Sequence, residues 1–103
     1  LAAKRRASRL AVVRETVGLL AYVTEDFATA LSELRAFQRI SGSEAQVAII
    51  IDCLRALDRS EDALKIARSL DRASLPGEAQ IDLAIVLSGI RLDRGEADRA
   101  PPG

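Results

Sequence analysis

Apolar side chains recur at steps of three and four residues along most of the chain, the pattern typical of amphipathic helices. The first such segment runs from Ser8 to Val23 and has its apolar positions at Leu10, Val13, Val17 and Leu20. A second segment after Thr24 carries a stripe at Phe27, Ala30, Leu31, Leu34 and Phe37. No segment sustains the alternation with a period of two that strands require. The sequence therefore predicts an all-α fold.

Three further helices are expected in the second half. The segment after Ser43 is apolar on most sides, so we expect it to be the most buried helix. A fourth helix begins at Ser60 and a fifth follows Pro76, ending near Leu92. A sixth begins near Gly95, just before the proline-rich end of the chain. Short turns between these segments favour antiparallel helix pairs.

Polar residues between the segments predict where the helices begin and end. Thr24, Ser43 and Ser60 are expected N-caps, because a hydroxyl oxygen can accept a hydrogen bond from a free backbone N–H of the first turn. Gln46, three residues after Ser43, completes a candidate capping box. Gly42 is expected to end the second helix in the left-handed conformation.

The helix pairs themselves are expected to repeat, and the alternative is an ordinary, non-repeating helical bundle. The stretch TEDFATALSELRAF, from Thr24, has the same shape as RSEDALKIARSL, from Arg59, and DRGEADRA begins the pattern again. Ala30, Ala63 and Ala97 mark equivalent positions at separations of 33 and 34 residues (63 − 30 and 97 − 63). Helix pairs at a period of about 34 residues are typical of tetratricopeptide (TPR) repeats, where small residues such as Gly18 let two helices pack closely.

The chain resembles TPR-like proteins of actinobacteria that have no established activity. The resemblance rests on SRLAVVRETVGLLAY, EDFATALSELRAF, RISGS and DCLRALDRSEDAL, and it covers nearly the whole chain. It implies a right-handed α-α superhelix over residues 1–100, followed by a tail at 101–103, in what we expect to be a fragment of a longer protein. The chain departs from the TPR consensus at Arg14, where Trp is usual, and at Leu34 and Ala67, where Phe is usual.

Composition and charge leave few functional classes open. The 15 basic residues balance the 15 acidic ones, so no global field attracts nucleic acid or a membrane surface. Histidine is absent, which removes serine triads and most zinc sites, and the glycines form no phosphate loop. The single cysteine, Cys53, is expected to be a buried structural thiol and fits a reducing cytoplasm. We therefore expect no catalysis, no metal and no cofactor.

Two surfaces remain as candidates for binding. The basic patch at the N-terminus consists of Lys4, Arg5, Arg6 and Arg9. Because no aromatic residue interleaves with these cations to stack bases, we do not expect nucleic-acid binding to be the main function. In a TPR-like superhelix the first helix of each pair lines a concave groove. That arrangement places Val12, Glu15, Leu19, Tyr22, Asp52, Arg55, Asp82 and Val86 along it.

The sequence thus favours a cytoplasmic, non-catalytic scaffold that holds a protein or peptide in this groove, with Tyr22 and Arg55 as anchors. Asp52 must face water or a cation, because burying it alone would be costly, and Arg55 is the expected ion-pair partner. An alternative is a structural module that forms a homodimer through exposed apolar end helices. Nucleic-acid binding by the basic patch is the third hypothesis.

Overall fold

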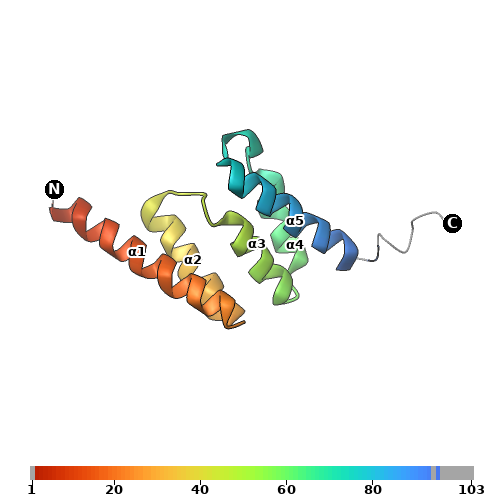
Figure 1. Ribbon diagram of the computed structural model, residues 1–103, viewed down its shortest axis with the longest axis horizontal. Helices are drawn as coiled ribbons and strands as arrows, with labels where there is room; N and C mark the ends of the chain where they lie inside the picture. The colour runs from red at the N-terminus through yellow and green to blue at the C-terminus, as the bar shows by residue number, and fades with distance from the viewer. Residues whose placement is uncertain (1, 94, 96–103) are drawn as a thin grey trace.

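The fold is a row of helices joined by short connections. The computed structural model describes residues 2–93 and 95, with side chains from Arg6 onward except that of Ala7. The helices in chain order are α1 (Ala2–Val23), α2 (Phe27–Ser41), α3 (Val47–Ala56), α4 (Ser60–Ser69) and α5 (Gly77–Asp93), with a short 3₁₀ helix, η1 (Arg72–Ser74), before α5. The described residues include no strand, which confirms the all-α prediction, and α1 and α2 run antiparallel (Figure 1).

The first helix pair is held by a close approach of α1 and α2. A Cβ atom added at Gly18 would lie 2.7 Å from Cγ of Leu34, a side chain with no exposed surface. The expectation that Gly18 allows close packing is therefore confirmed. Beside this contact, Arg14 forms an ion pair of 2.8 Å with Glu33, and the rings of Tyr22 and Phe27 meet edge to face at 6.0 Å.

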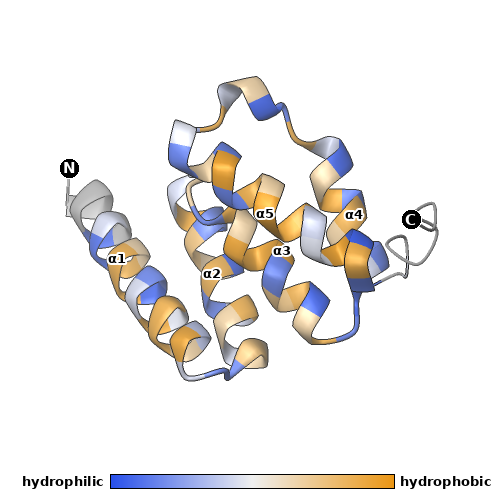
Figure 2. Cartoon of the chain, turned by 45° about the vertical axis from the view of Figure 1, so that its right-hand side comes forward, coloured by the Kyte–Doolittle hydropathy of each residue, from blue (hydrophilic) through white to orange (hydrophobic). Residues whose placement is uncertain are grey.

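Helix α3 lies at the centre of the core, as its apolar composition predicts. Its buried residues are Val47, Ala48, Ile50, Ile51, Cys53 and Leu54. Ala30 of α2 and Ala63 of α4 are fully buried in the same cluster, which also contains Leu83 and Ile90 of α5. Figure 2 shows these apolar faces turned inward around α3. Burial of Ala, Leu, Ile and Val supplies the main force holding the helices together.

The start and the orientation of α1 differ from what its sequence indicates. The helix begins at Ala2 rather than Ser8, so residues 2–7 belong to α1. Its apolar stripe is also not its buried face. Leu10, Val13, Val17 and Leu20 are 41–60% exposed, and the residues that pack inward include Ala11, Gly18 and Ala21. The periodicity therefore identified the helix but not the side that faces the core.

Each of the three predicted N-caps was wrong. The carboxylate of Asp26, not the Thr24 hydroxyl, caps α2 by accepting a hydrogen bond from the backbone N–H of Thr29. The Ser43 hydroxyl accepts from the N–H of Ala45, before α3 begins, and the capping box with Gln46 does not form. Ser60 lies inside the first turn of α4 and makes no capping bond.

The helix ends were predicted better than the starts. Gly42 follows α2 with φ +70°, and its N–H bonds to the carbonyl of Gln38, as expected for a left-handed C-cap.

Pro76 precedes α5, and its carbonyl accepts from the N–H of Gln80. The predicted sixth helix, with Ala97, falls outside the described residues. In the part of the chain that is described, no helix combines the length and apolar character needed to cross a membrane.

Candidate functional site

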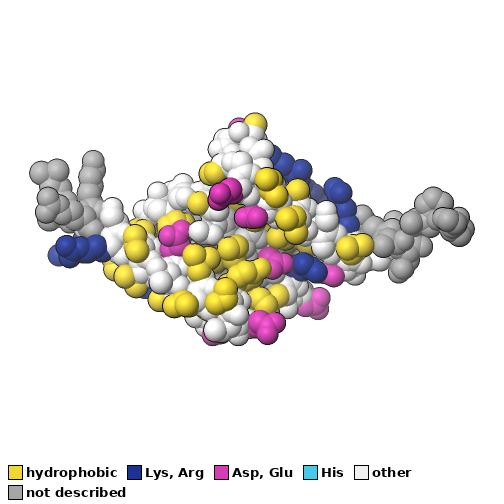
Figure 3. All heavy atoms as spheres, in the orientation of Figure 1, with side chains coloured by type: hydrophobic (Ala, Val, Ile, Leu, Met, Phe, Trp, Pro, Cys, Tyr) yellow, Lys and Arg dark blue, Asp and Glu magenta, His cyan; other side chains and the backbone are white. Residues whose placement is uncertain are grey.

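An open apolar hollow lies on the face formed by α1, α3 and α5. It has a volume of about 270 Å³ and is lined by Tyr22, Ala48, Ile49, Asp82, Ile85 and Val86. Three separate parts of the chain contribute to it: the last turn of α1, the first half of α3 and the middle of α5. Figure 3 shows this face with hydrophobic side chains across its centre and acidic side chains among them.

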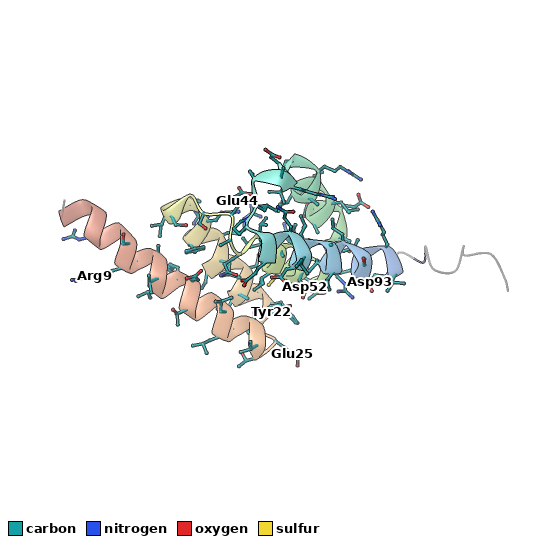
Figure 4. The ribbon with its side chains drawn as sticks, turned by 45° about the horizontal axis from the view of Figure 1, so that its top comes forward. Arg9, Tyr22, Glu25, Glu44, Asp52 and Asp93 are labelled. Carbon is teal, nitrogen blue, oxygen red and sulfur yellow. The ribbon has the colours of Figure 1, made fainter. Side chains whose placement is uncertain are left out.

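A line of polar contacts runs along the edge of the hollow. We call Tyr22, Asp52, Arg55 and Asp93 the polar network. The Tyr22 hydroxyl donates a 2.5 Å hydrogen bond to one carboxylate oxygen of Asp52, whose other oxygen accepts from Arg55 at 3.2 Å. Arg55 also donates through Nε and a terminal nitrogen to the Asp93 carboxylate. The network therefore joins α1, α3 and α5 (Figure 4).

Local helix geometry explains why Asp52 and Arg55 act together. They are three residues apart on α3, so both side chains project from the same face. Arg55 then lies across α5 at Gly89, where a Cβ atom would approach its guanidinium nitrogen to 2.6 Å. Glycine at this position leaves room for the guanidinium to reach Asp93 one turn further along. The predicted ion pair between Asp52 and Arg55 is present, and Asp93 extends it.

The network shifts the proton affinities of its members. Burial, and then the hydrogen bond to Asp52, raise the pKa of Tyr22 from its ordinary value of 10.0 to about 12. The hydrogen bonds with Asp93 raise the pKa of Arg55, and the same contact lowers the pKa of the Asp93 carboxyl below its usual 3.8. At neutral pH the Tyr22 phenol is therefore neutral, the Arg55 guanidinium is charged and the Asp93 carboxyl is ionised.

A second polar contact connects α1 with the start of α3. The side-chain amide of Gln46 donates to the carboxylate of Glu15 at 2.8 Å. Glu15 and Tyr22 are seven residues apart and so lie on the same side of α1, two turns from each other. Two polar contacts, one at Glu15 and one at Tyr22, therefore connect this side of α1 with α3 and the residue before it.

The structure brings most of the sequence-predicted groove residues together. Tyr22, Asp82 and Val86 line the hollow, and Asp52 and Arg55 border it through the network. Leu19 is half-buried and packs against the core, while Glu15 bonds to Gln46. Val12 is different: it is 60% exposed and lines a separate shallow depression with Ser8, Arg9 and Val13. It does not belong to this face.

Of the basic patch, Arg6 and Arg9 are exposed on the first half of α1, and Figure 4 shows Arg9 far from the polar network. The side chains of Lys4 and Arg5 lie outside the described residues. The described part of the patch and the hollow therefore lie towards opposite ends of α1.

Several site residues were not found from the sequence. Ala48, Ile49 and Ile85 line the hollow, and Asp93 completes the polar network. Gly89 did carry a signal, because glycine inside a helix costs about 1 kcal/mol relative to alanine and so calls for a packing reason.

The buried thiol near the site is held unreactive. Cys53 has no exposed surface, as the sequence predicts, and burial followed by the charge of Asp52 raises its pKa from 9.0 to about 11. Among the described residues, no group of three or more His, Cys, Asp or Glu side chains is arranged to hold a metal ion. What the arrangement does offer is an apolar hollow with carboxylates beside it.

Comparison with family models, with curated proteins and with solved structures finds no match to this chain.

Proposed function

We propose that this chain is a non-catalytic binding module that holds a peptide or helix of a partner protein on the face formed by α1, α3 and α5. The observation that carries the proposal is the hollow itself, an apolar depression bordered by a polar network to which three helices contribute. In a TPR-like superhelix these three helices would be the first members of successive pairs, which line the binding groove.

The size of the hollow favours side chains over a whole small molecule. Its volume of about 270 Å³ lies below the usual 300–1,000 Å³ of small-molecule pockets. Ala48, Ile49 and Val86 give it apolar walls suited to one or two aliphatic side chains of a peptide. A bound side chain would cover Ile85, which is 64% exposed in the free chain.

The charges beside the hollow favour a basic partner. Four carboxylates lie on this face, at Glu15, Asp52, Asp82 and Asp93, beside the guanidinium of Arg55, which gives −3 for these five groups. Arg55 is already paired with two of the carboxylates. A peptide with Lys or Arg beside an aliphatic anchor therefore complements the face, and its association should weaken with salt.

Peptide selection tests the proposal directly. A displayed peptide library is selected on the 103-residue chain, and the enriched peptides are then measured by fluorescence anisotropy against the parent and two variants. Ile85→Asp places a charge in the hollow, whereas Ile81→Asp makes the same change one turn earlier, at a residue with the same 64% exposure outside the hollow. We expect Ile85→Asp to weaken binding at least about tenfold and Ile81→Asp to leave it within about twofold.

The proposal fails if no peptide is enriched, or if enriched peptides bind the Ile85→Asp variant as tightly as the parent. Peptides enriched in Asp or Glu would contradict the charge argument while leaving the location of the site intact. A partner that depended on Arg6 and Arg9 instead would move the binding surface to the first half of α1.

A further inference from the structure

The outer side of α1 carries an apolar stripe that is left exposed by the described part of the chain. We call Leu10, Val13, Val17 and Leu20 the outer stripe; their exposed fractions are 47%, 56%, 41% and 60%. Val17 lies two positions before Leu19, and Leu20 lies two positions before Tyr22. Two positions correspond to a rotation of about 200° around the helix, so the stripe points away from the residues that face α3. The outer stripe and the hollow therefore point in different directions.

The spacing of the outer stripe is the same in both directions along the helix. The steps between its residues are three, four and three, and the residue types read leucine, valine, valine, leucine from either end. A second α1 laid antiparallel, with a two-fold axis on the outer side at the level of residue 15, would place Leu10 against Leu20 and Val13 against Val17 of the other copy. An interface related by a two-fold axis requires this kind of self-complementary patch.

The charges along α1 also suit an antiparallel copy. The first turns carry the exposed cations Arg6 and Arg9, while exposed Glu25 follows the other end of the helix (Figure 4). The first turn contains no acid and the last turn no base, so the helix leaves both ends of its own dipole uncompensated. In the antiparallel arrangement, Arg6 of one copy lies opposite Thr24 and beside Glu25 of the other.

We infer that the outer stripe is a homodimer interface, in which α1 packs antiparallel against α1 of a second copy with Val13 opposite Val17. The assembly would leave the hollow of each copy accessible, because the hollow lies on the other side of α1. Two peptide-binding faces would then belong to one dimer, at opposite ends of a shared helix pair. The inference does not depend on what the hollow binds.

Sedimentation equilibrium of the full 103-residue chain tests whether the dimer forms. We expect the parent to be dimeric at about 100 μM, and the double variant Val13→Glu with Val17→Glu to raise the dissociation constant at least about tenfold. Ile81→Glu is the control for each of the two substitutions, since it adds one glutamate at an exposed apolar residue of α5 and should leave the dimer unchanged. Circular dichroism checks that each variant keeps the parent's helix content.

Disulfide trapping tests the orientation. The experiment uses a Cys53→Ala background and mixes two differently tagged chains, one with Val13→Cys and one with Val17→Cys. The antiparallel axis predicts a crosslink between the two chains in the mixture, and little crosslinking in either chain alone, because equal positions would be offset by about 6 Å along the helix axis. A charge test completes it: Arg6→Glu and Glu25→Arg should each weaken the dimer at low salt, and their combination should restore it.

Four outcomes would overturn the inference: a monomer at about 100 μM, a dimer that survives the double glutamate variant, a dimer that is lost with Ile81→Glu, and crosslinking of Val13→Cys to itself. Crosslinking of Val13→Cys to itself would indicate parallel helices. Loss of the dimer with Ile81→Glu would place the interface on α5. A dimer that is lost only with the stripe variants, and that crosslinks only in the mixture, supports it.

Discussion

The Tyr22 hydroxyl of α1 donates a 2.5 Å hydrogen bond to Asp52 of α3, across 30 residues of sequence. This contact accounts for an acidic residue on the most apolar helix of the chain. The other Asp52 oxygen accepts from Arg55, so both oxygens have protein partners, as polar groups near a core require. One carboxylate therefore ties the first helix to α3 and, through Arg55, to α5.

Replacing Tyr22 by phenylalanine should destabilise the fold while leaving its packing intact. The ring keeps its edge-to-face contact with Phe27, but the partly buried Asp52 carboxylate loses a donor. Removing a hydrogen bond to a charged group costs about 1–3 kcal/mol, and we expect the lower half of that range because Arg55 remains as a partner. Urea unfolding followed by circular dichroism measures the change. A loss close to zero would mean that the hydrogen bond contributes nothing net to stability.

The same substitution should change how stability depends on alkaline pH. The folded state raises the pKa of Tyr22 to about 12, so it holds the phenolic proton more tightly than the unfolded chain does. The stability that Tyr22 contributes is then complete below pH 10 and is lost as the pH rises towards 12. We expect the free-energy difference between parent and Tyr22→Phe to shrink over this range. Cys53 makes the parent lose stability from about pH 9 to 11 as well, but this loss is common to both proteins.

Two glycine-to-alanine substitutions should differ in their effect on stability, because only one of them destabilises the fold. At Gly18 the new methyl group would meet the side chain of Leu34 at 2.7 Å and its backbone nitrogen at 3.3 Å, where nothing can move aside. Overpacking of this kind costs about 1–3 kcal/mol, which exceeds the roughly 1 kcal/mol that alanine gains in a helix. We expect Gly18→Ala to lower the free energy of unfolding.

At Gly89 the new methyl group meets only the mobile end of Arg55. The guanidinium can move away, so we expect Gly89→Ala to leave stability unchanged or to raise it by up to about 1 kcal/mol. Its cost falls on the network: the hydrogen bonds from Arg55 to Asp93 should be lost. The Arg55 Nε–H signal in a proton–nitrogen NMR spectrum reports this directly, and a signal unchanged from the parent would contradict the role assigned to Gly89.

The turn before α2 offers a direct comparison of two candidate caps. Asp26→Ala removes the side chain that accepts from Thr29, and loss of an N-cap costs about 0.5–2 kcal/mol. Thr24→Ala removes only bonds from the hydroxyl to the carbonyls of Leu20 and Ala21 at the end of α1, and its effect should be smaller. Thermal unfolding of the two variants decides between them, and a larger loss at Thr24 would show that the sequence-based assignment was the better one.

The two caps illustrate why helices could be predicted from the sequence and their first residues could not. Periodic apolar positions and the helix-ending Gly42 locate each helix, since both signals are local. Between Thr24 and Asp26, however, several residues can cap, and the choice depends on backbone geometry. Glu25 has φ +64°, which moves the helix start beyond it. Which side of α1 faces the core was equally undetermined, because its apolar residues nearly encircle the helix.

The site shows the same division between local and distant information. Asp52 and Arg55 were predicted to pair because they are three residues apart on one helix, and they do. Asp93 was missed because it lies 38 residues from Arg55. Its place at the end of α5 also explains the aspartate as a turn residue, without any contact to Arg55. The approach of Arg55 to Gly89 depends on how α3 and α5 cross, which no short stretch of sequence specifies.

Cys53 should report on the opening of the core rather than on catalysis. Its side chain has no exposed surface, and its pKa of about 11 leaves about one thiolate in 10⁴ at pH 7. Both conditions suppress attack on a disulfide reagent, since the thiolate must form and must be reached. We expect the native chain to react with Ellman's reagent several orders of magnitude more slowly than the urea-unfolded chain. Tyr22→Phe loosens the contact between α1 and α3, so the thiol of the native variant should react faster. The rate should rise by the same factor as the population of the open state, which the loss of stability increases. Native reaction at the rate of a free thiol would mean that the centre of α3 is accessible to solvent.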